Sequence, residues 1–274
     1  GPAWGLKNFW INEGHSFGIT AAGGAGWQLG EWIIDGEPTI DMMGVDPRRF
    51  GDYATKSYLI KKNEEAYANV FTIHYPDEER EEGRPLRQAP CYDRLKDNGA
   101  VFGQKFGWER ANWFAPKGVE QKDDWSFRRS KWFKHVGNEC KNVQENVGLL
   151  DMTAFAKCRI SGPGAESFLD NLIANKLPKK NGRINLCHAL NTNGGVLSEY
   201  TIAKESNDSY YIVSAGAFQR LDHDWINKWL PKDRSVTFEN LTNSIGVLVI
   251  AGPKAKDLME KVSYTDFSNE NFPW

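Results

Sequence analysis

Two short turns of the pattern Gly-Pro-x-Ala, 90 residues apart, constrain the fold of this chain more than any other feature. The first spans residues 162–165 and the second residues 252–255. Each turn follows an apolar run, and each precedes a segment in which apolar residues recur every three or four positions. A proline fits the first turn of a helix, because the N–H group that it lacks has no partner there. The spacing therefore predicts two copies of a strand, a glycine turn and a helix that folds back on the strand.

The residues between the two copies predict further strands and one helix. Alternating patterns favour strands at residues 199–203, 210–214 and 236–239. A helix is indicated by apolar residues at helical spacing, namely Phe218, Leu221, Trp225, Ile226 and Trp229. This order of elements is typical of an α+β domain with mainly antiparallel pairing, and we expect such a domain over residues 101–274.

The first 45 residues predict a strand, a glycine-rich turn and a helix. The apolar run at residues 9–11 is the candidate strand, and glycines are frequent in residues 14–26. Helical spacing runs from Ile19 to Ile34, and Gly36 supplies a stop. Backbone N–H groups at such a turn and at the helix N-terminus favour an anion or an electron-rich carbonyl. The turn lacks the G-x-G-x-x-G pattern of dinucleotide sites, so close packing of the helix on a sheet remains the alternative.

Composition excludes several classes of function. Lys and Arg total 34 against 36 Asp and Glu, a net charge of −2, so neither nucleic acid nor an anionic membrane surface is indicated as a partner. The longest strongly apolar stretch, residues 245–251, is far shorter than the ~20 residues that cross a bilayer. The four cysteines form no C-x-x-C pair, so we expect free thiols and no metal site. Residues 46–100 are polar and turn-rich without an evident catalytic motif, and no G-x-S-x-G occurs in the chain.

Glu199 is the main candidate site residue in the second half of the chain. It follows an Asn-Gly-Gly turn at residues 193–195, so we expect it on one face of a strand just after a tight hairpin. A carboxylate there suits paired N–H donors of a heterocycle or a substrate amine, and the alternative is a strand residue that faces solvent. His188 is a lesser candidate, because a lone histidine is more often structural than catalytic.

Tryptophan is unusually frequent, with 11 residues. Exposed indoles stack on flat ligands, so Trp108, Trp113 and Trp125 suggest a surface that binds carbohydrate or peptide. The tryptophans alternate with Arg and Lys, which favours packing at a seam between domains with cation–π contacts. The first interpretation predicts exposed indoles, and the second predicts that they are mostly buried.

Three sets of motifs follow one another along nearly the whole chain. The first set is residues 8–11, 14–19, 23–26, 31–38 and 46–51, the second is residues 74–80, 83–85 and 107–110, and the third is residues 151–157, 194–195 with Glu199, and 251–253. In this order they resemble dimethylglycine and sarcosine dehydrogenases. The first set resembles the end of their FAD domain, the second their short central domain, and the third the N-terminal part of the aminomethyltransferase (glycine-cleavage T-protein) folate-binding fold.

The resemblance implies an α+β multidomain fragment. Residues 1–45 would be the C-terminal strand and helix of an FAD-binding α/β domain, and residues 46–100 the small central domain of the FAD-dependent oxidoreductase. Residues 101–274 would be the N-terminal part of an aminomethyltransferase-like folate-binding domain, truncated at its end.

The resemblance also implies a flavoprotein that oxidises an N-methyl group of a small glycine derivative. FAD would accept a hydride, leaving an iminium, and tetrahydrofolate would capture the one-carbon unit as methylene-tetrahydrofolate. The residues implied to contact FAD are Gly14, His15, Ser16, Phe17, Gly18 and Ile19, with Gly23 and Gly24 at the adjoining helix start. Glu199 resembles the acidic folate contact of the family, with Tyr200 and Thr201 beside it. Glu199 would bind the pterin, and the alternative is that it acts as a catalytic base on the folate amine.

The implied partners are a small N-methylated amino acid and an electron acceptor, either a flavoprotein or O2, with no nucleic acid and no membrane span. The implied location is the cytoplasm in a bacterium and the mitochondrial matrix in a eukaryote. The family's FAD fingerprint, its flavin-attaching histidine and its second folate motif have no counterpart in this sequence. We therefore expect this chain alone neither to hold FAD stably nor to turn over substrate. A non-redox, aminomethyltransferase-like folate-binding protein is the alternative from another functional class.

Overall fold

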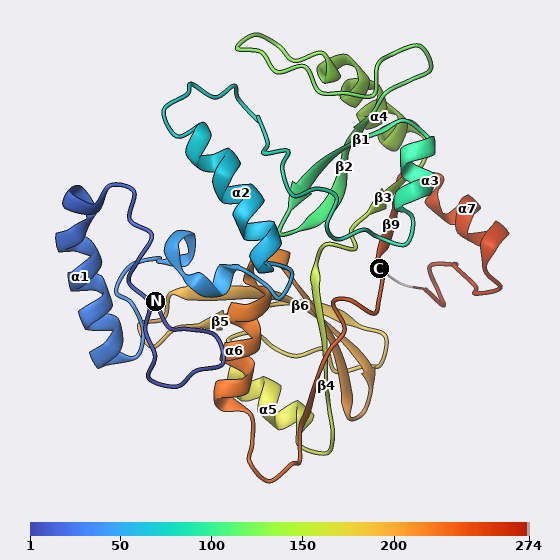
Figure 1. Cartoon of the computed structure of the whole chain (residues 1–274). Coiled ribbons are helices and arrows are strands. Elements are labelled where there is room, and N and C mark those ends of the chain that lie inside the picture. Colours follow the sequence, from blue (N-terminus) through green and yellow to red (C-terminus); the bar gives the residue numbers. More distant parts are fainter. Residues whose placement is uncertain (273–274) are drawn as a thin grey trace. The chain divides into compact units, whose positions relative to one another are not determined.

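The computed structural model describes residues 1–272, and its helices and strands belong to two compact units (Figure 1). Unit 1 combines Gly1–Asp52 with Ala156–Leu241, and unit 2 combines Tyr53–Phe155 with the residues from Thr242 onward. Pro273 and Trp274, with which the expected folate-binding domain ends, lie outside the described residues. Each unit is therefore assembled from two separate stretches of the chain.

Unit 1 is built on a five-stranded antiparallel sheet with the strand order β5-β6-β7-β4-β8. Its strands are β4 (Ala156–Ser161), β5 (Ile184–Leu190), β6 (Val196–Ser206), β7 (Ser209–Ser214) and β8 (Thr237–Asn240). The three strands expected between the two turns are thereby confirmed as β6, β7 and β8. Burial alternates along β6 and β7, so one face of the sheet lies in the core, and the other is exposed along much of β6 and half-buried along β7.

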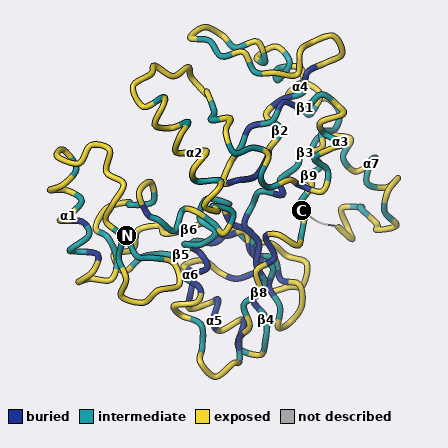
Figure 2. Tube along the Cα trace, in the orientation of Figure 1, coloured by how far each residue is buried: buried dark blue, intermediate teal, exposed yellow. Residues whose placement is uncertain are grey.

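Helices α5 (Ala165–Leu172) and α6 (Gln219–Trp229) pack on the inner face of this sheet. Leu169 of α5 is 0% exposed and Ile226 of α6 is 1% exposed, and both share one core with Ile160 of β4. Figure 2 shows this core as dark blue segments of the strands. Burying one such aliphatic side chain contributes about 2 kcal/mol, so these two helices fix which face of the sheet is covered.

Both copies of the predicted strand, turn and helix are present. β4 leads through Gly162 into α5, and β9 (Leu248–Ala251) leads through Gly252 into α7 (Ala255–Val262). The two glycines have φ of 114° and 126°, and a Cβ atom would lie 2.4 and 2.5 Å from a backbone oxygen. Only glycine fits such positions. Each proline lies just before its helix and not in the first helical turn, which corrects the expected position.

The expected N-terminal helix is confirmed as α1 (Gly18–Asp35), which ends at Gly36 in the left-handed conformation. The glycine-rich residues 21–26 lie inside this helix and do not form the turn before it. The chain turns earlier, at Gly14, where φ is 79°. The helix therefore starts before most of the glycines that were expected to precede it.

The strand expected at residues 9–11 is not formed. Trp10 makes an isolated bridge with Pro2, and the ring of Trp10 contacts Trp32 edge to face at 5.9 Å between ring centroids. On α1 the buried residues are Gln28 and Trp32, and Figure 2 shows most of the helix as exposed. Trp10 therefore makes a local contact with α1, whereas Phe9 is exposed.

Unit 2 contains two antiparallel strand pairs and four helices within the described residues. The pairs are β1 (Ala100–Lys105) with β2 (Trp108–Phe114), and β3 (Gly148–Asp151) with β9. The helices other than α7 are α2 (Lys56–Ala68), α3 (Tyr92–Asp97) and α4 (Trp132–Glu145).

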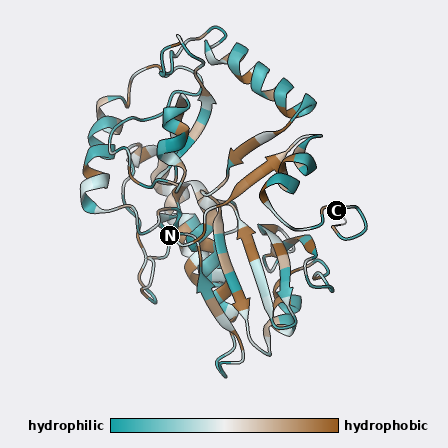
Figure 3. Ribbon diagram, turned by 90° about the vertical axis from the view of Figure 1, so that its right-hand side faces the viewer, coloured by the Kyte–Doolittle hydropathy of each residue, from teal (hydrophilic) through white to brown (hydrophobic). Residues whose placement is uncertain are grey.

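Three short 3-10 helices, Met43–Val45, Pro47–Arg49 and Gly216–Phe218, belong to unit 1. In Figure 3 the hydrophobic colour concentrates on strands, whereas the helices are mostly hydrophilic.

The tryptophans of the β1–β2 hairpin pack inside unit 2. Trp108 is 7% exposed and Trp113 is 3% exposed, and Trp125 is half-buried. The Trp113 indole N–H donates to Asp123 Oδ1 at 2.8 Å, and the Arg87 guanidinium lies 4.2 Å from the Trp108 ring centroid. The interpretation as an exposed binding surface is therefore wrong for Trp108 and Trp113. Their predicted burial, with a cation–π contact, is confirmed.

Candidate functional site

The hairpin between β5 and β6 sets the position of Glu199. Asn191 organises the turn, because its Oδ1 accepts the Gly195 N–H at 2.7 Å and the Asn193 N–H at 3.1 Å. Gly194 supplies the positive φ of 79°. Glu199 follows near the start of β6, and its side chain is 61% exposed on the outer face. The expected placement on one face of a strand after a tight hairpin is confirmed.

The outer face of the sheet around Glu199 combines a polar pair with apolar side chains. Glu199 lies opposite His188 of β5, and its Oε2 is 3.4 Å from the imidazole Nε2. Thr201 is exposed farther along β6, and Leu186 lies opposite it with 55% exposure. Leu197, on the other side of Glu199, is 39% exposed. An open carboxylate flanked by leucines can accept N–H groups of a flat heterocycle whose ring contacts the leucines.

The inner face beneath Glu199 carries a buried carboxylate. Asp222 of α6 is 3% exposed. Its Oδ1 accepts the Tyr200 hydroxyl at 3.2 Å, and its Oδ2 accepts the Ser214 hydroxyl at 2.5 Å. Burial raises the pKa of Asp222 to about 6, although hydrogen bonds from Ser198, Ser214 and Tyr200 oppose this rise. The carboxylate therefore ties α6 to both β6 and β7.

Tyr200 belongs to this inner face and not to the surface that holds Glu199. It is 1% exposed, and burial raises the pKa of its hydroxyl well above the ordinary value. Its side chain packs against β6 from the core side, so it can affect folate binding only indirectly, through the position of the strand. Asp222 is not among the site residues predicted from the sequence, although its position carries a signal, since it stands four residues from both Phe218 and Ile226. That spacing places it on the apolar stripe of the helix.

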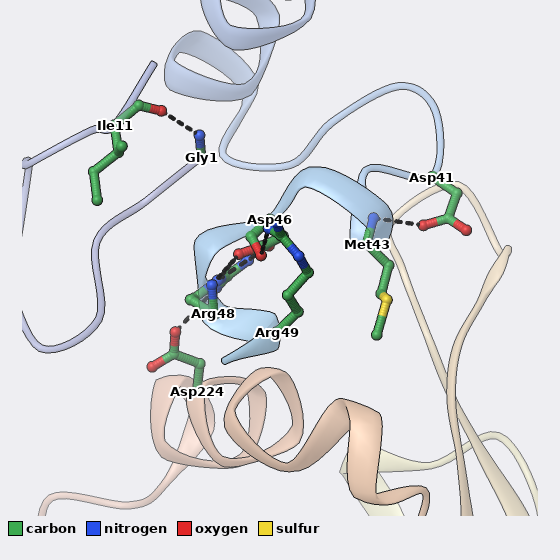
Figure 4. A network of polar contacts seen from close by, with 8 residues as sticks. All are labelled: Gly1, Ile11, Asp41, Met43, Asp46, Arg48, Arg49 and Asp224. Atoms are coloured by element: carbon green, nitrogen blue, oxygen red, sulfur yellow. Dashed lines mark hydrogen bonds and ion pairs between the residues drawn. The ribbon is translucent and has the colours of Figure 1, made fainter. Parts of the chain in front are cut away.

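The segment after α1, residues 36–49, makes polar contacts with the rest of unit 1 at two places. Glu37 accepts the Thr192 hydroxyl at the tip of the β5–β6 hairpin. Farther along, Arg48 pairs with Asp46 at 2.7 Å and with Asp224 of α6 at 3.0 Å (Figure 4). Asp46 is 2% exposed and also accepts the Arg48 backbone N–H at 2.8 Å. The segment is thereby tied to the hairpin that presents Glu199 and to the helix that covers the inner face.

The second group of predicted site residues forms a separate set at the start of α1. All of its members are exposed: Gly14, His15, Ser16, Phe17, Gly18, Ile19, Gly23 and Gly24. A Cβ atom at Gly18, Gly23 or Gly24 would meet none of the described atoms within 4 Å, so packing inside the described chain does not explain these glycines. Gly23 and Gly24 lie in the second turn of α1, which corrects their expected position at its start. The first N–H groups of the helix, which have no partner within it, open to the surface.

The possible metal ligands and the cysteines are the remaining reactive side chains of residues 1–272. No group of three or more His, Cys, Asp or Glu side chains in this range is placed to hold a metal ion. The four cysteines are free thiols, as expected. Burial raises the pKa of Cys158 to about 12, which makes this thiol unreactive. Among the described helices, none has the length and apolar character needed to cross a membrane.

The chain matches two family models and several known proteins. Residues 35–89 match the FAD dependent oxidoreductase central domain, and residues 91–274 match the GCVT N-terminal domain. Mitochondrial dimethylglycine dehydrogenase of Rattus norvegicus is 34% identical over 273 residues, which cover 99% of this chain and 32% of the relative. Mitochondrial sarcosine dehydrogenase of Homo sapiens is 27% identical over 317 residues, which cover 100% of this chain and 34% of the relative. The chain thus spans about a third of the length of the curated relatives that it matches.

A solved structure gives the same fold for part of the chain. The glycine cleavage system aminomethyltransferase T from Bartonella henselae superposes with a TM-score of 0.54 at 18% identity, and the match covers 66% of this chain and 45% of that chain. At this identity the likeness shows the fold alone. The expected combination of an oxidoreductase central domain with an aminomethyltransferase-like domain is confirmed. The chain belongs to the GCVT N-terminal domain family, its residues 35–89 match the FAD dependent oxidoreductase central domain, and its sequence is similar to dimethylglycine and sarcosine dehydrogenases.

Proposed function

We propose that this chain is part of a flavoprotein that oxidatively demethylates dimethylglycine or sarcosine and passes the one-carbon unit to tetrahydrofolate. The observation that carries the proposal is the exposed Glu199 carboxylate on the open face of β6, within the aminomethyltransferase-like part of the chain. The match of residues 35–89 to an FAD dependent oxidoreductase central domain supports the flavoprotein over a non-redox folate-binding protein.

The residues around Glu199 fit a reduced pterin. Its carboxylate accepts hydrogen bonds, the Thr201 hydroxyl both donates and accepts, and Leu186 and Leu197 offer apolar contact to a ring. Tetrahydrofolate supplies the amine that takes up the one-carbon unit. Glu199 would hold the N–H groups of the pterin, and a role as base toward the folate amine is the second part of the proposal.

The start of α1 fits a contact with FAD, which supplies the hydride acceptor when bound. Gly14 to Ile19 are exposed, and the helix N-terminus carries partial positive charge that stabilises an anion. Gly18, Gly23 and Gly24 leave open space within the described chain, which would let a flat ring approach the backbone. In this proposal residues 1–45 complete an FAD domain, residues 46–100 form the central domain and residues 101–274 begin the folate-binding domain.

The proposal extends to the setting of the protein. The substrate is a small N-methylated amino acid, and electrons pass to a flavoprotein or to O2. The protein works in the cytoplasm of a bacterium or in the mitochondrial matrix of a eukaryote. Because the chain spans about a third of its relatives, we expect it alone neither to retain FAD nor to turn over substrate.

Folate binding by Glu199 variants of the intact protein tests the proposal. A hydrogen bond to a charged group contributes about 1.5–3 kcal/mol, so Glu199→Gln is expected to weaken 5-formyltetrahydrofolate binding at least about tenfold in calorimetric titration. Glu205→Gln is the matched control, because Glu205 also lies on the outer face of β6 but pairs with Arg159 at 2.7 Å. The proposal fails if Glu199→Gln binds this folate as tightly as the control does.

A further inference from the structure

The hydrogen bonds of Asn175 fix the proton on the His188 imidazole. Asn175 Oδ1 accepts the backbone N–H of His188 at 2.8 Å and lies 3.1 Å from the imidazole Nδ1. A backbone N–H can only donate, so the amide atom that faces it is the oxygen and the orientation of the Asn175 amide is settled. An oxygen without a proton can only accept from the imidazole as well. Nδ1 of His188 is therefore the protonated nitrogen.

The backbone around His188 is held on the same side. The His188 carbonyl accepts the Ala174 N–H at 2.9 Å, and the Asn185 side chain donates to the Lys176 carbonyl at 2.8 Å. The loop that follows α5 thus runs along the edge strand β5 and brings Asn175 to His188 as part of this edge. The imidazole is consequently anchored through its backbone and through Nδ1.

The anchored imidazole directs Nε2 at Glu199. The distance from Nε2 to Glu199 Oε2 is 3.4 Å. If Nε2 carried only its lone pair, it would face a carboxylate with like charge density, so the contact is attractive only when Nε2 also bears a proton. The imidazole ring therefore lies between the Asn175 amide oxygen and the Glu199 carboxylate, with one ring nitrogen facing each of them.

We propose that His188 is a positioning residue for Glu199, a proposal that rests on the folate-binding function proposed above. Glu199 has three rotatable side-chain bonds and is 61% exposed, so a free carboxylate would lose conformational entropy on binding a ligand. The His188 contact holds Oε2 and leaves Oε1 open to the N–H donors of a pterin. The chain of contacts from Asn175 through His188 to Glu199 orients the carboxylate before the ligand arrives.

If His188 and Glu199 formed only an ordinary surface ion pair, loss of their contact would leave the affinity for the ligand unchanged, because such pairs contribute little and are independent of any ligand. Two isosteric variants separate the functions of the two imidazole nitrogens. His188→Gln can place an amide N–H group near the position of Nε2, whereas His188→Asn can place one only near that of Nδ1. In titrations of the intact protein with 5-formyltetrahydrofolate, we expect His188→Asn to weaken binding about threefold to tenfold and His188→Gln to stay within about twofold. In a Glu199→Ala background the same His188→Asn change should cause no further loss, since it acts through Glu199.

The imidazole proton provides a readout that does not depend on folate. In protein labelled with ¹⁵N-histidine, the His188 signal, identified by its loss in His188→Gln, should show protons on both Nδ1 and Nε2. A neutral imidazole with a proton on only one of the two nitrogens overturns the proposal. It is also overturned if Glu199→Ala weakens binding but His188→Asn does not, in which case the folate function stands. If neither Glu199→Ala nor His188→Asn affects binding, the proposed function fails together with it.

Discussion

The pH dependence of unfolding should reveal two buried groups that stand next to each other on α6. Asp222 is 3% exposed and His223 is 7% exposed. Burial raises the pKa of Asp222 from its ordinary value of 3.8 to about 6, and it lowers the pKa of His223 from 6.5 to about 4. In both cases the folded protein favours the neutral form over the charged one, because the interior solvates charge poorly.

The two groups change the free energy of unfolding in opposite directions. Asp222 has a raised folded pKa, so its stabilisation is fully present below pH 3.8 and is lost as the pH rises through about 6. His223 has a lowered folded pKa, so its stabilisation is present above pH 6.5 and is lost as the pH falls through about 4. At 1.36 kcal/mol per pH unit each effect amounts to about 3 kcal/mol. In the wild-type protein the two effects nearly cancel between pH 4 and 6.

Single substitutions should expose each effect. Relative to wild type, the free energy of unfolding of Asp222→Asn should rise by about 3 kcal/mol from pH 4 to 6, because only the histidine effect remains. The free energy of unfolding of His223→Gln should fall by a similar amount relative to wild type over the same range. The pH dependence of the double variant should be parallel to that of wild type. Urea unfolding followed by tryptophan fluorescence at half-unit pH steps measures these differences. Parallel curves for Asp222→Asn and wild type would mean that burial does not shift the Asp222 ionisation, and the reasoning would be refuted.

Two further substitutions test the packing of unit 1 by the same unfolding assay. Gly162→Ala should destabilise by about 2–3 kcal/mol, because its Cβ would lie 2.4 Å from the Ser235 carbonyl oxygen. Gly182→Ala should destabilise by only about 1 kcal/mol, because Gly182 also has a positive φ but no described atom lies within 4 Å of its Cβ position. Equal destabilisation by the two substitutions would contradict the steric argument. Arg48→Met should destabilise by about 3 kcal/mol, since it leaves the buried Asp46 carboxylate unpaired. Arg159→Met breaks ion pairs with the more exposed Glu205 and Glu239 and should lose less than about 1 kcal/mol, so a loss as large as that of Arg48→Met would argue against the role of burial.

Local patterns predicted most elements of unit 1 but not β5, and they predicted a strand at residues 9–11 that does not form. The arrangement of the elements depends on contacts between distant residues. The period-two alternation of β6 and the glycine turn at Gly162 are visible in the sequence and appear in the structure. The placement of β4 between β7 and β8 is not visible in the sequence, because Ile160 pairs with Tyr210 and Phe238, which lie 50 and 78 residues away. Such register follows from the shared core and from turn geometry, not from any one segment.

The candidate site residues also differ in whether local sequence patterns predict them. Glu199 could be predicted because a hairpin turn and a strand are both local signals, as described above. Asp222 was overlooked because a charged residue on a helix is ordinarily solvated, and only the tertiary contacts with Tyr200 and Ser214 make it an interior group. Trp108 and Trp113 were ambiguous for the converse reason, since an indole suits a surface or a core equally well until its neighbours are known.

The buried network and the exposed carboxylate depend on each other through the register of β6. Tyr200 and Glu199 are consecutive residues, so they point to opposite faces of the sheet. A shift of the strand by one residue would bring Glu199 into the core and Tyr200 to the surface. The Tyr200 hydroxyl finds its acceptor on Asp222 only in the observed register, and an unpaired buried carboxylate or hydroxyl would cost about 1–3 kcal/mol. The polar groups on the closed face thus help to keep Glu199 and Thr201 on the open face, where the proposed folate contact requires them.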